Sequence, residues 1–367
     1  MKQTAVTVTV FLTLLACGDR DAEYAVGGST GLLYEPVLVL QIPGTAPNGD
    51  LTFGYAMAAT RLSNGTVVIG DNLGPSVQYV DANGELVTTA GREGGGPGEF
   101  MGVSWLGQCG PDSVFVWDGR QNRMSVFDAQ GEFVRQYQFP ADASISARIG
   151  ATRCSRSGVF ALQGLPRRPS IPTPSGPGEQ YRTPLWLADA LGHTMHELQD
   201  IAMGELRPMG KFTGVALTSD HMYVGTADSA YVDVYGLDGV LTRVIAVGVQ
   251  LRRPTEHHYE RAIVAQVGGS GSTEFRRDWI ERLSEIPMPD YMPPYTGVFA
   301  TAEGTLWVLV SVPGDSTTKL RAFEPDGTMI RDVHLPPDLR VLEVGDDYFL
   351  GAYEDEEGEP FVVMYRI

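Results

Sequence analysis

The unit at residues 113–137 reads Ser-Val-Phe-Val-Trp (113–117), Met-Ser-Val-Phe (124–127), Gln130-Gly131 and Glu-Phe-Val-Arg-Gln-Tyr (132–137). Runs of β-branched and aromatic residues bounded by Gly, Asp and Asn are typical of strands. The glycine of the turn supplies a positive φ between two of them. The same turn recurs at Asn83-Gly84, Leu191-Gly192, Asp238-Gly239 and Asp326-Gly327. This repetition predicts a β-propeller.

The spacing of the turns indicates where the repeat is interrupted. The turn glycines lie 47, 61, 47 and 88 residues apart, so the long intervals hold insertions, which we place at 163–184 and 250–296. Residues 256–267 and 274–286, inside the second insertion, are predicted helices. Strands equivalent to 113–117 occur six times along the chain, at 66–69, 113–117, 159–162, 222–225, 306–310 and 348–350.

The sixth unit ends at Ile367 before a fourth strand, and residues 34–42 could supply the missing one. We therefore predict an all-β fold, a six-bladed propeller of four-stranded antiparallel blades, with a helical insertion between blades four and five. An N-terminal strand pairs with the C-terminal blade and closes the ring, because closure removes exposed sheet edges.

The N-terminus has the pattern of a processing signal. Lys2 is followed by an apolar stretch at 5–16, which is too short to span a bilayer. The stretch ends in Leu14-Leu15-Ala16-Cys17, which resembles the bacterial lipoprotein box; the alternative is an ordinary secretory signal with a chance cysteine. We predict a lipoprotein signal peptide at 1–16, lipidation of Cys17, a tether at 17–32 and a propeller at 33–367.

Gly18 after the cysteine is similar to the outer-membrane sorting pattern of diderm bacteria. We expect a lipid-anchored protein of the bacterial cell envelope, in the outer membrane, with the propeller in the periplasm or at the surface. Two acyl chains on one residue suffice for stable anchoring.

Two cysteines remain in this oxidising compartment. Cys109 and Cys154 each lie five residues before a strand, at Val114 and Val159, in consecutive units. This shared register favours a disulfide between neighbouring blades. The alternative is two separate thiols, with Cα atoms beyond the roughly 7 Å bridging limit.

The charge excludes one class of partner. A formal charge of −18 and a pI of about 4.7 make a surface that repels phosphate backbones, so nucleic acid is not expected. The partners that we expect are the membrane, through the lipid, and an envelope protein or a small-molecule or saccharide ligand, bound by a monomeric ring.

The segment Gly-Arg-Glu-Gly-Gly-Gly-Pro-Gly-Glu-Phe at 91–100 follows a fourth strand directly. It resembles the loop of the six-bladed, NHL-repeat-like propeller lipoproteins of bacteria. Asp71-Asn72 with residues 77–81, and residues 293–297 with 304–308, are similar to the NHL pattern too. The resemblance implies the fold and leaves the function open.

Loops between second and third strands share one propeller face with the connections between blades, and both insertions fall in such loops. They could form a lid over the channel; the alternative is packing with no ligand. The candidate ligand-binding residues at that mouth are Asp71, Asn72, Arg92, Asp118, Arg120 and Arg123. Arginines there could clamp a carboxylate or sulfate, whereas the aspartates could instead cap loop backbone.

Signals for catalysis and metal binding are weak. The chain has no Gly-Xaa-Ser-Xaa-Gly motif, and we assign no catalytic residue, no metal ligand and no cofactor. Calcium at the acidic run 354–359 is possible, and a solvated loop is the alternative. We therefore expect a non-catalytic ligand-binding or protein-interaction module. The alternatives are a metal-dependent gluconolactonase-like or amidating-lyase-like propeller enzyme and a structural subunit of an envelope complex.

Overall fold

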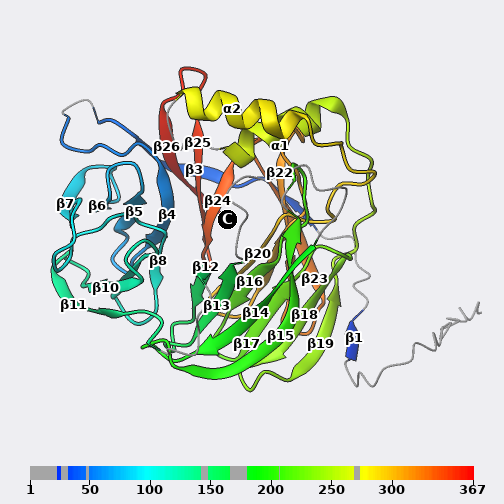
Figure 1. The fold of residues 1–367 in the computed structure, drawn as a ribbon, viewed down its shortest axis with the longest axis horizontal. Helices are drawn as coiled ribbons and strands as arrows, with labels where there is room; N and C mark the ends of the chain where they lie inside the picture. The colour runs from blue at the N-terminus through cyan, green and yellow to red at the C-terminus, as the bar shows by residue number, and fades with distance from the viewer. Residues whose placement is uncertain are drawn as a thin grey trace, which may run out of the picture.

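Six four-stranded antiparallel blades surround a central channel in the computed structural model (Figure 1). The structure describes residues 23–25, 32–46, 49–141, 148–165, 180–205, 207–267 and 273–367. The predicted fold class is confirmed.

Within each blade the first strand lines the channel and the fourth lies at the rim. Blade 1 consists of β4 (Ala56–Arg61), β5 (Val67–Asp71), β6 (Ser76–Val80) and β7 (Leu86–Ala90). Blade 2 consists of β8 (Trp105–Gln108), β9 (Val114–Asp118), β10 (Arg123–Phe127) and β11 (Phe133–Gln138). Blade 3 consists of β12 (Arg148–Cys154), β13 (Phe160–Leu165), β14 (Gln180–Ala188) and β15 (Thr194–Glu205).

The second half of the ring repeats this order. Blade 4 consists of β16 (Gly214–Leu217), β17 (His221–Gly225), β18 (Tyr231–Gly236) and β19 (Leu241–Ala246). Blade 5 consists of β20 (Gly297–Ala300), β21 (Leu306–Leu309), β22 (Thr318–Phe323) and β23 (Met329–Leu335). Blade 6 consists of β24 (Arg340–Val344), β25 (Tyr348–Glu354), β26 (Pro360–Arg366) and β3 (Val37–Pro43).

Both ends of the chain build blade 6. β3 runs antiparallel to β26, with Leu40 opposite Met364 and Ile42 opposite Val362. The strand was expected at 34–42 and begins later, at Val37, because Tyr34 belongs to another strand.

The segment before β3 lies along the outer rim. β2 (Leu32–Tyr34) pairs in parallel with β23, and β1 (Glu23–Ala25) pairs in parallel with β19, so blades 5 and 4 each gain a fifth strand. Of the expected tether at 17–32, residues 23–25 and 32 are strand, and residues 17–22 and 26–31 lie outside the described residues. The physical reason is that backbone groups on an open sheet edge need partners.

Hydrophobic packing between neighbouring blades forms the core. Each of the six blade interfaces has its own cluster of buried side chains. β9 shows the pattern, since Val114 and Val116 pack toward blade 1 while Phe115 and Trp117 pack toward blade 3. Because side chains alternate along a strand, a strand buried on both faces reads as a continuous apolar run. This is why the second strands stand out in the sequence.

The repeated turns owe their sequence to an aspartate as well as a glycine. The Asp81 carboxylate accepts hydrogen bonds from the backbone N–H groups of Asn83 and Glu85, and Gly84 has a φ of 87°. Asp128 makes the corresponding bonds in the next blade. The N–H groups of Glu85 and Asn83 hold the pKa of Asp81 below its usual value.

The insertion between blades 4 and 5 forms α1 (Glu256–Val267) and α2 (Thr273–Ser284), close to the predicted helices. Within the described residues, no helix combines the length and the apolar character needed to cross a membrane. Tyr259 and Ile263 of α1 and Leu283 of α2 pack with Met209 and Val312, which come from two blade loops. Of the other predicted insertion, 163–184, residues 166–179 lie outside the described residues.

Leu40→Ala should lower the free energy of unfolding by about 2–5 kcal/mol, because it opens a cavity between blades 6 and 1. Leu40 is 7% exposed in the strand that closes the ring, whereas Leu38 on the same strand is 46% exposed. Leu38→Ala is therefore the matched control and should cost about 1 kcal/mol or less. Guanidinium unfolding curves measure both, and equal losses would contradict ring closure through the buried face of β3.

Candidate functional site

The two predicted aspartates lie at the ends of second strands and hold loop backbone. The Asp71 carboxylate accepts hydrogen bonds from the N–H groups of Tyr55, Leu73 and Gly74 at 3.0–3.1 Å. Asp118 holds the corresponding loop of blade 2 through the N–H groups of Met101, Arg120 and Gln121. Both carboxylates are buried.

The predicted arginines gather around the glycine-rich loop at 91–100. Arg92 forms an ion pair of 2.7 Å with Glu99, and Arg123 donates to the carbonyl oxygens of Gly95 and Glu99. Glu99 also accepts the N–H of Gly96 at 2.7 Å, and this bond, followed by Arg92, lowers the Glu99 pKa. The loop thus surrounds a carboxylate of its own chain.

Arg120 donates to the carbonyl oxygen of Met101 at 2.9 Å, and the N–H of Asn72 donates to Tyr55. The six predicted residues therefore lie together on one face of blades 1 and 2, each with a partner in the protein. Their role in ligand binding stays a prediction.

The cavity that joins all six blades is the central channel, of about 730 Å³. Its walls are residues 57–63, 104–108, 153–156, 212–219, 296–300 with 302, and 340–348. Its volume falls in the usual range for small-molecule sites, roughly 300–1,000 Å³.

One end of the channel is formed by the turns between first and second strands. We call it the hairpin mouth; its residues are 62–63, 155–156, 218–219, 302 and 345–347. The insertion helices belong to the opposite side, because they follow a fourth strand. In Figure 1 they lie over one sector of the ring, and none of the described residues between 250 and 295 lines the channel. The expected lid over the channel is therefore not formed by α1 and α2.

The insertion is instead fixed to the rim by polar contacts. Asp315 lies in the loop after β21, and its two carboxylate oxygens accept hydrogen bonds from Nη1 and Nη2 of Arg252 at 2.8 and 2.7 Å. His258 Nε2 lies 3.3 Å from Oδ1 of the same carboxylate. Arg261 of α1 pairs with Asp338 at 2.8 Å. Together with the apolar cluster of α1 and α2, these contacts explain why the helices stay at the edge.

Four arginines line the channel although the chain is strongly acidic: Arg61, Arg153, Arg156 and Arg340. Arg340 lies at the helix-bearing end, 4.5 Å from the Tyr55 ring centroid, and donates to the carbonyl oxygen of Ala56. Burial lowers the pKa of Arg340. Arg153 is accessible from the channel, yet desolvation by the surrounding walls lowers its pKa as well.

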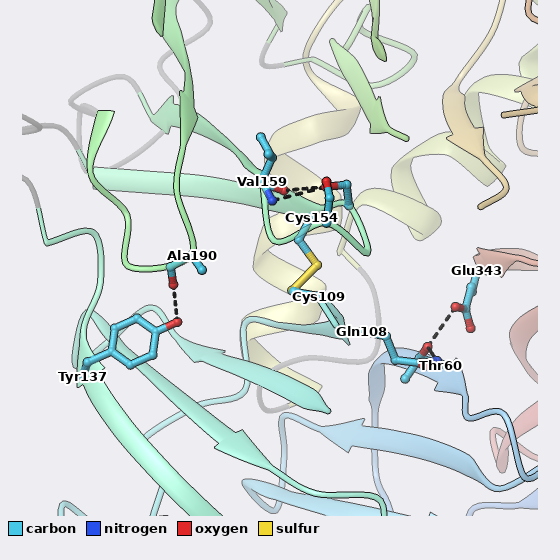
Figure 2. The surroundings of a disulfide bond; sticks show 10 residues. Thr60, Gln108, Cys109, Tyr137, Cys154, Val159, Ala190 and Glu343 are labelled. Atoms are coloured by element: carbon cyan, nitrogen blue, oxygen red, sulfur yellow. Dashed lines mark hydrogen bonds between the residues drawn. A yellow bond between two sulfur atoms is a disulfide. The ribbon is translucent and has the colours of Figure 1, made fainter. Parts of the chain in front are cut away.

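A partly buried acid lies near the hairpin mouth. Glu343 of β24 accepts the Thr60 hydroxyl at 2.8 Å and the Arg61 N–H at 2.9 Å, so it joins blade 6 to blade 1 (Figure 2). Burial raises the pKa of Glu343 to about 7, although these two hydrogen bonds and one from Tyr348 favour the carboxylate. Burial and the charge of Glu343 raise the pKa of Tyr348 in turn.

The polar contacts continue into blades 2 and 3. Gln108 Nε2 donates to Thr60 Oγ1 at 3.1 Å and to the carbonyl oxygen of Arg61 at 2.6 Å. The next residue, Cys109, forms a disulfide with Cys154, with Cα atoms 5.4 Å apart (Figure 2). One wall of the hairpin mouth is thereby cross-linked from blade 6 through blades 1 and 2 to blade 3.

The described residues contain no group of three or more His, Cys, Asp or Glu side chains arranged to hold a metal ion. The channel acids Glu343, Asp346 and Asp347 all come from blade 6. In the acidic run considered for calcium, Asp355 accepts the N–H groups of Glu357 and Glu359, as a turn aspartate does in other blades.

The sequence interpretation missed Arg61, Arg156 and Glu343. It aligned the units on their second and third strands, whereas these residues lie near the ends of first strands or in the following turn. Aligning the first strands would have placed Arg61 and Gln108 at the same position, the last residue of β4 and of β8.

Comparison with known proteins supports the fold alone. No family model and no curated protein matches the chain. A protein of Bacteroides fragilis described as exported is similar with a TM-score of 0.53 at 13% identity, covering 92% of this chain and 99% of that one. A DUF4221 family member from Bacteroides vulgatus gives a TM-score of 0.51 at 12% identity, covering 90% and 97%. A gluconolactonase from Xanthomonas campestris gives 0.43 at 12% identity, covering 85% and 88%, a likeness that carries no functional argument.

Glu343→Gln should remove a pH dependence of stability. The pKa of Glu343 in the folded protein, about 7, lies above its ordinary value of 4.5. The stability that Glu343 contributes is therefore full below pH 4.5 and is lost as the pH rises through 7. Between pH 5 and pH 8 the contribution of Glu343 to the free energy of unfolding should be lost in wild type and unchanged in the variant. The variant should therefore gain stability relative to wild type over this range, measured by unfolding curves. Glu356→Gln, at an exposed turn, is the control; an equal pH trend in both variants would contradict the raised pKa.

Proposed function

We propose that this protein is a lipid-anchored, extracytoplasmic binding module that takes a small ligand into its central channel. The observation that carries the proposal is the channel itself. It is a cavity of about 730 Å³ to which all six blades contribute, with four arginines in its walls. Concave sites with a few convergent polar groups are the usual places for small-molecule binding.

The anchor and the compartment rest on separate grounds. The lipoprotein-like sequence ending at Cys17 supports an anchor in the bacterial cell envelope, with the outer membrane as its destination; these residues lie outside the described part of the chain. The structural neighbour described as exported is compatible with that location. So is the disulfide, since such bonds persist in oxidising compartments.

A metal-dependent propeller enzyme gains no support from the described residues. Such an enzyme needs ligands from several blades around the channel, whereas the acids that line this one belong to blade 6. Binding without catalysis therefore accounts better for the arrangement. A second candidate function is the binding of a protein partner by the monomeric ring, at the face that carries the NHL-like loop at 91–100.

Ala302→Trp should abolish retention of the channel ligand. Ala302 is an exposed turn residue at the hairpin mouth, so an indole there narrows the channel at little cost to the fold. Ala82→Trp, at an exposed turn on the outer rim of blade 1, is the matched control. Native mass spectrometry of protein purified from its own envelope should detect a small bound molecule in wild type and Ala82→Trp and lose it in Ala302→Trp. Equal retention in both variants would refute a channel site.

Cys17→Ser should release the protein from the membrane, because the acyl chains that we propose would have no attachment point. Membrane and soluble fractions probed by immunoblot, together with incorporation of labelled palmitate, measure the effect. Gly18→Ala, next to the proposed acceptor, should stay in the membrane fraction. A Cys17→Ser protein that still sediments with membranes and carries label would disprove the anchor.

A further inference from the structure

We propose that the hairpin mouth binds a small organic carboxylate between Arg61 and Arg156, and that binding is coupled to the uptake of one proton by Glu343. The inference rests on the channel proposed above as the ligand site and adds the chemical class of the ligand and its linkage to pH.

Arg156 is the first element of the argument. It lies in the turn after β12, is exposed, and lines the channel. Among the described residues no side chain forms an ion pair or a hydrogen bond with it. Burial raises the pKa of both Glu343 and Tyr348, and the positive charge of Arg156 opposes that rise, so its charge reaches the site. An accessible guanidinium thus lies at the mouth, on blade 3.

Arg61 provides the second guanidinium. Its guanidinium carbon lies over the Tyr348 ring, 5.0 Å from the centroid, and its Nε is buried with no hydrogen-bond partner among the described residues. One ion pair, 3.3 Å from Nη1 to Asp347, occupies the outer edge, and the Asp347 side chain is 65% exposed. Because that pair is near solvent, it stabilises little. The contact does show that a carboxylate fits against this face of Arg61.

The two guanidinium groups determine the chemical class. A guanidinium presents a planar fork of N–H donors that matches a carboxylate in two parallel hydrogen bonds. The mouth also displays Asp346 and Asp347, which disfavour ligands of high negative charge. A single carboxylate on a small organic body therefore suits the site better than a multiply charged phosphate.

Glu343 gives the site its dependence on protons. The groups that act on it are the Arg61 N–H of β4 and the Tyr348 hydroxyl of β25, which donate to it, and the charge of Arg156 of blade 3. Arg340, Asp346 and Asp347 of its own blade line the same channel. An ionised Glu343 would place a second negative charge beside the incoming carboxylate in a poorly solvated wall. Neutral Glu343 removes that repulsion. Since burial raises its pKa to about 7, both forms are populated near neutral pH.

Isothermal titration calorimetry of the full-length protein in detergent tests this with acetate, benzoate and D-glucuronate as probes, and D-glucose as the neutral counterpart of glucuronate. At least one carboxylate should bind, and its Kd should rise about tenfold between pH 6 and pH 8. Titrations at pH 7 in buffers of different ionisation enthalpy should report uptake of about half a proton per carboxylate bound.

The variants separate the roles. Arg61→Gln and Arg156→Gln should each weaken binding at least tenfold. Arg156→Gln is the one that preserves the fold, because Arg156 is exposed and has no side-chain partner among the described residues. Glu343→Gln should bind with the same Kd at pH 6 and pH 8. Arg277→Gln, on α2, removes an equal charge elsewhere; the Arg277 side chain is 74% exposed, and this variant should bind as wild type.

Four outcomes would overturn the inference. They are no binding of any of the three carboxylates at 10 mM, binding of glucose as tight as glucuronate, preference for inorganic phosphate over all carboxylates, and wild-type affinity in Arg156→Gln. If wild type retains a neutral molecule that Ala302→Trp loses, the channel is a ligand site but its ligand is not a carboxylate. That result would contradict this inference and support the proposed function.

Discussion

Packing of one blade against the next is the constraint on which the remaining structure depends. Each blade buries both faces, so its second strand must be apolar on each side, as Val116 and Trp117 are in β9. No blade can cover both faces alone, and the ring is the arrangement in which every face finds a neighbour. The position of the channel and the sharing of blade 6 between the two ends of the chain both follow from this requirement.

In the part of the ring that the structure describes, the channel wall is built from polar as well as apolar side chains. First strands are short and approach one another around the axis, and their inward residues include Arg61, Gln108 and Glu343. The bonds from Gln108 through Thr60 to Glu343, with the disulfide of Cys109, join four successive blades on one wall. This wall joins the blade that carries Glu343 to the blade that carries Arg61.

The sequence predicted the ring because its signals are local. A turn glycine with positive φ, as at Gly84, and a strand buried on both faces, as at 114–118, can each be read from a few neighbouring residues. The candidate site depended on which side chains from distant units converge, and that information is not local. Arg61 is the last residue of β4 and resembles a surface residue in the sequence, while Asp71 and Asp118, which were candidate ligand-binding residues, hold their own loops. The parallel strands β1 and β2 are too short to carry a recognisable pattern.

The strand exchange in blade 6 has a consequence for the order of folding. During synthesis β3 is among the first strands to leave the ribosome, and its partner β26 is the last. Blades 1 to 5 can therefore assemble as an open arc, but the interface between blades 6 and 1 has to wait for the final residues of the chain. Until then β3 is an unpaired strand with exposed backbone groups, which is a hazard for aggregation. A chain that lacks its last strand would keep most of its blades and lose its closure.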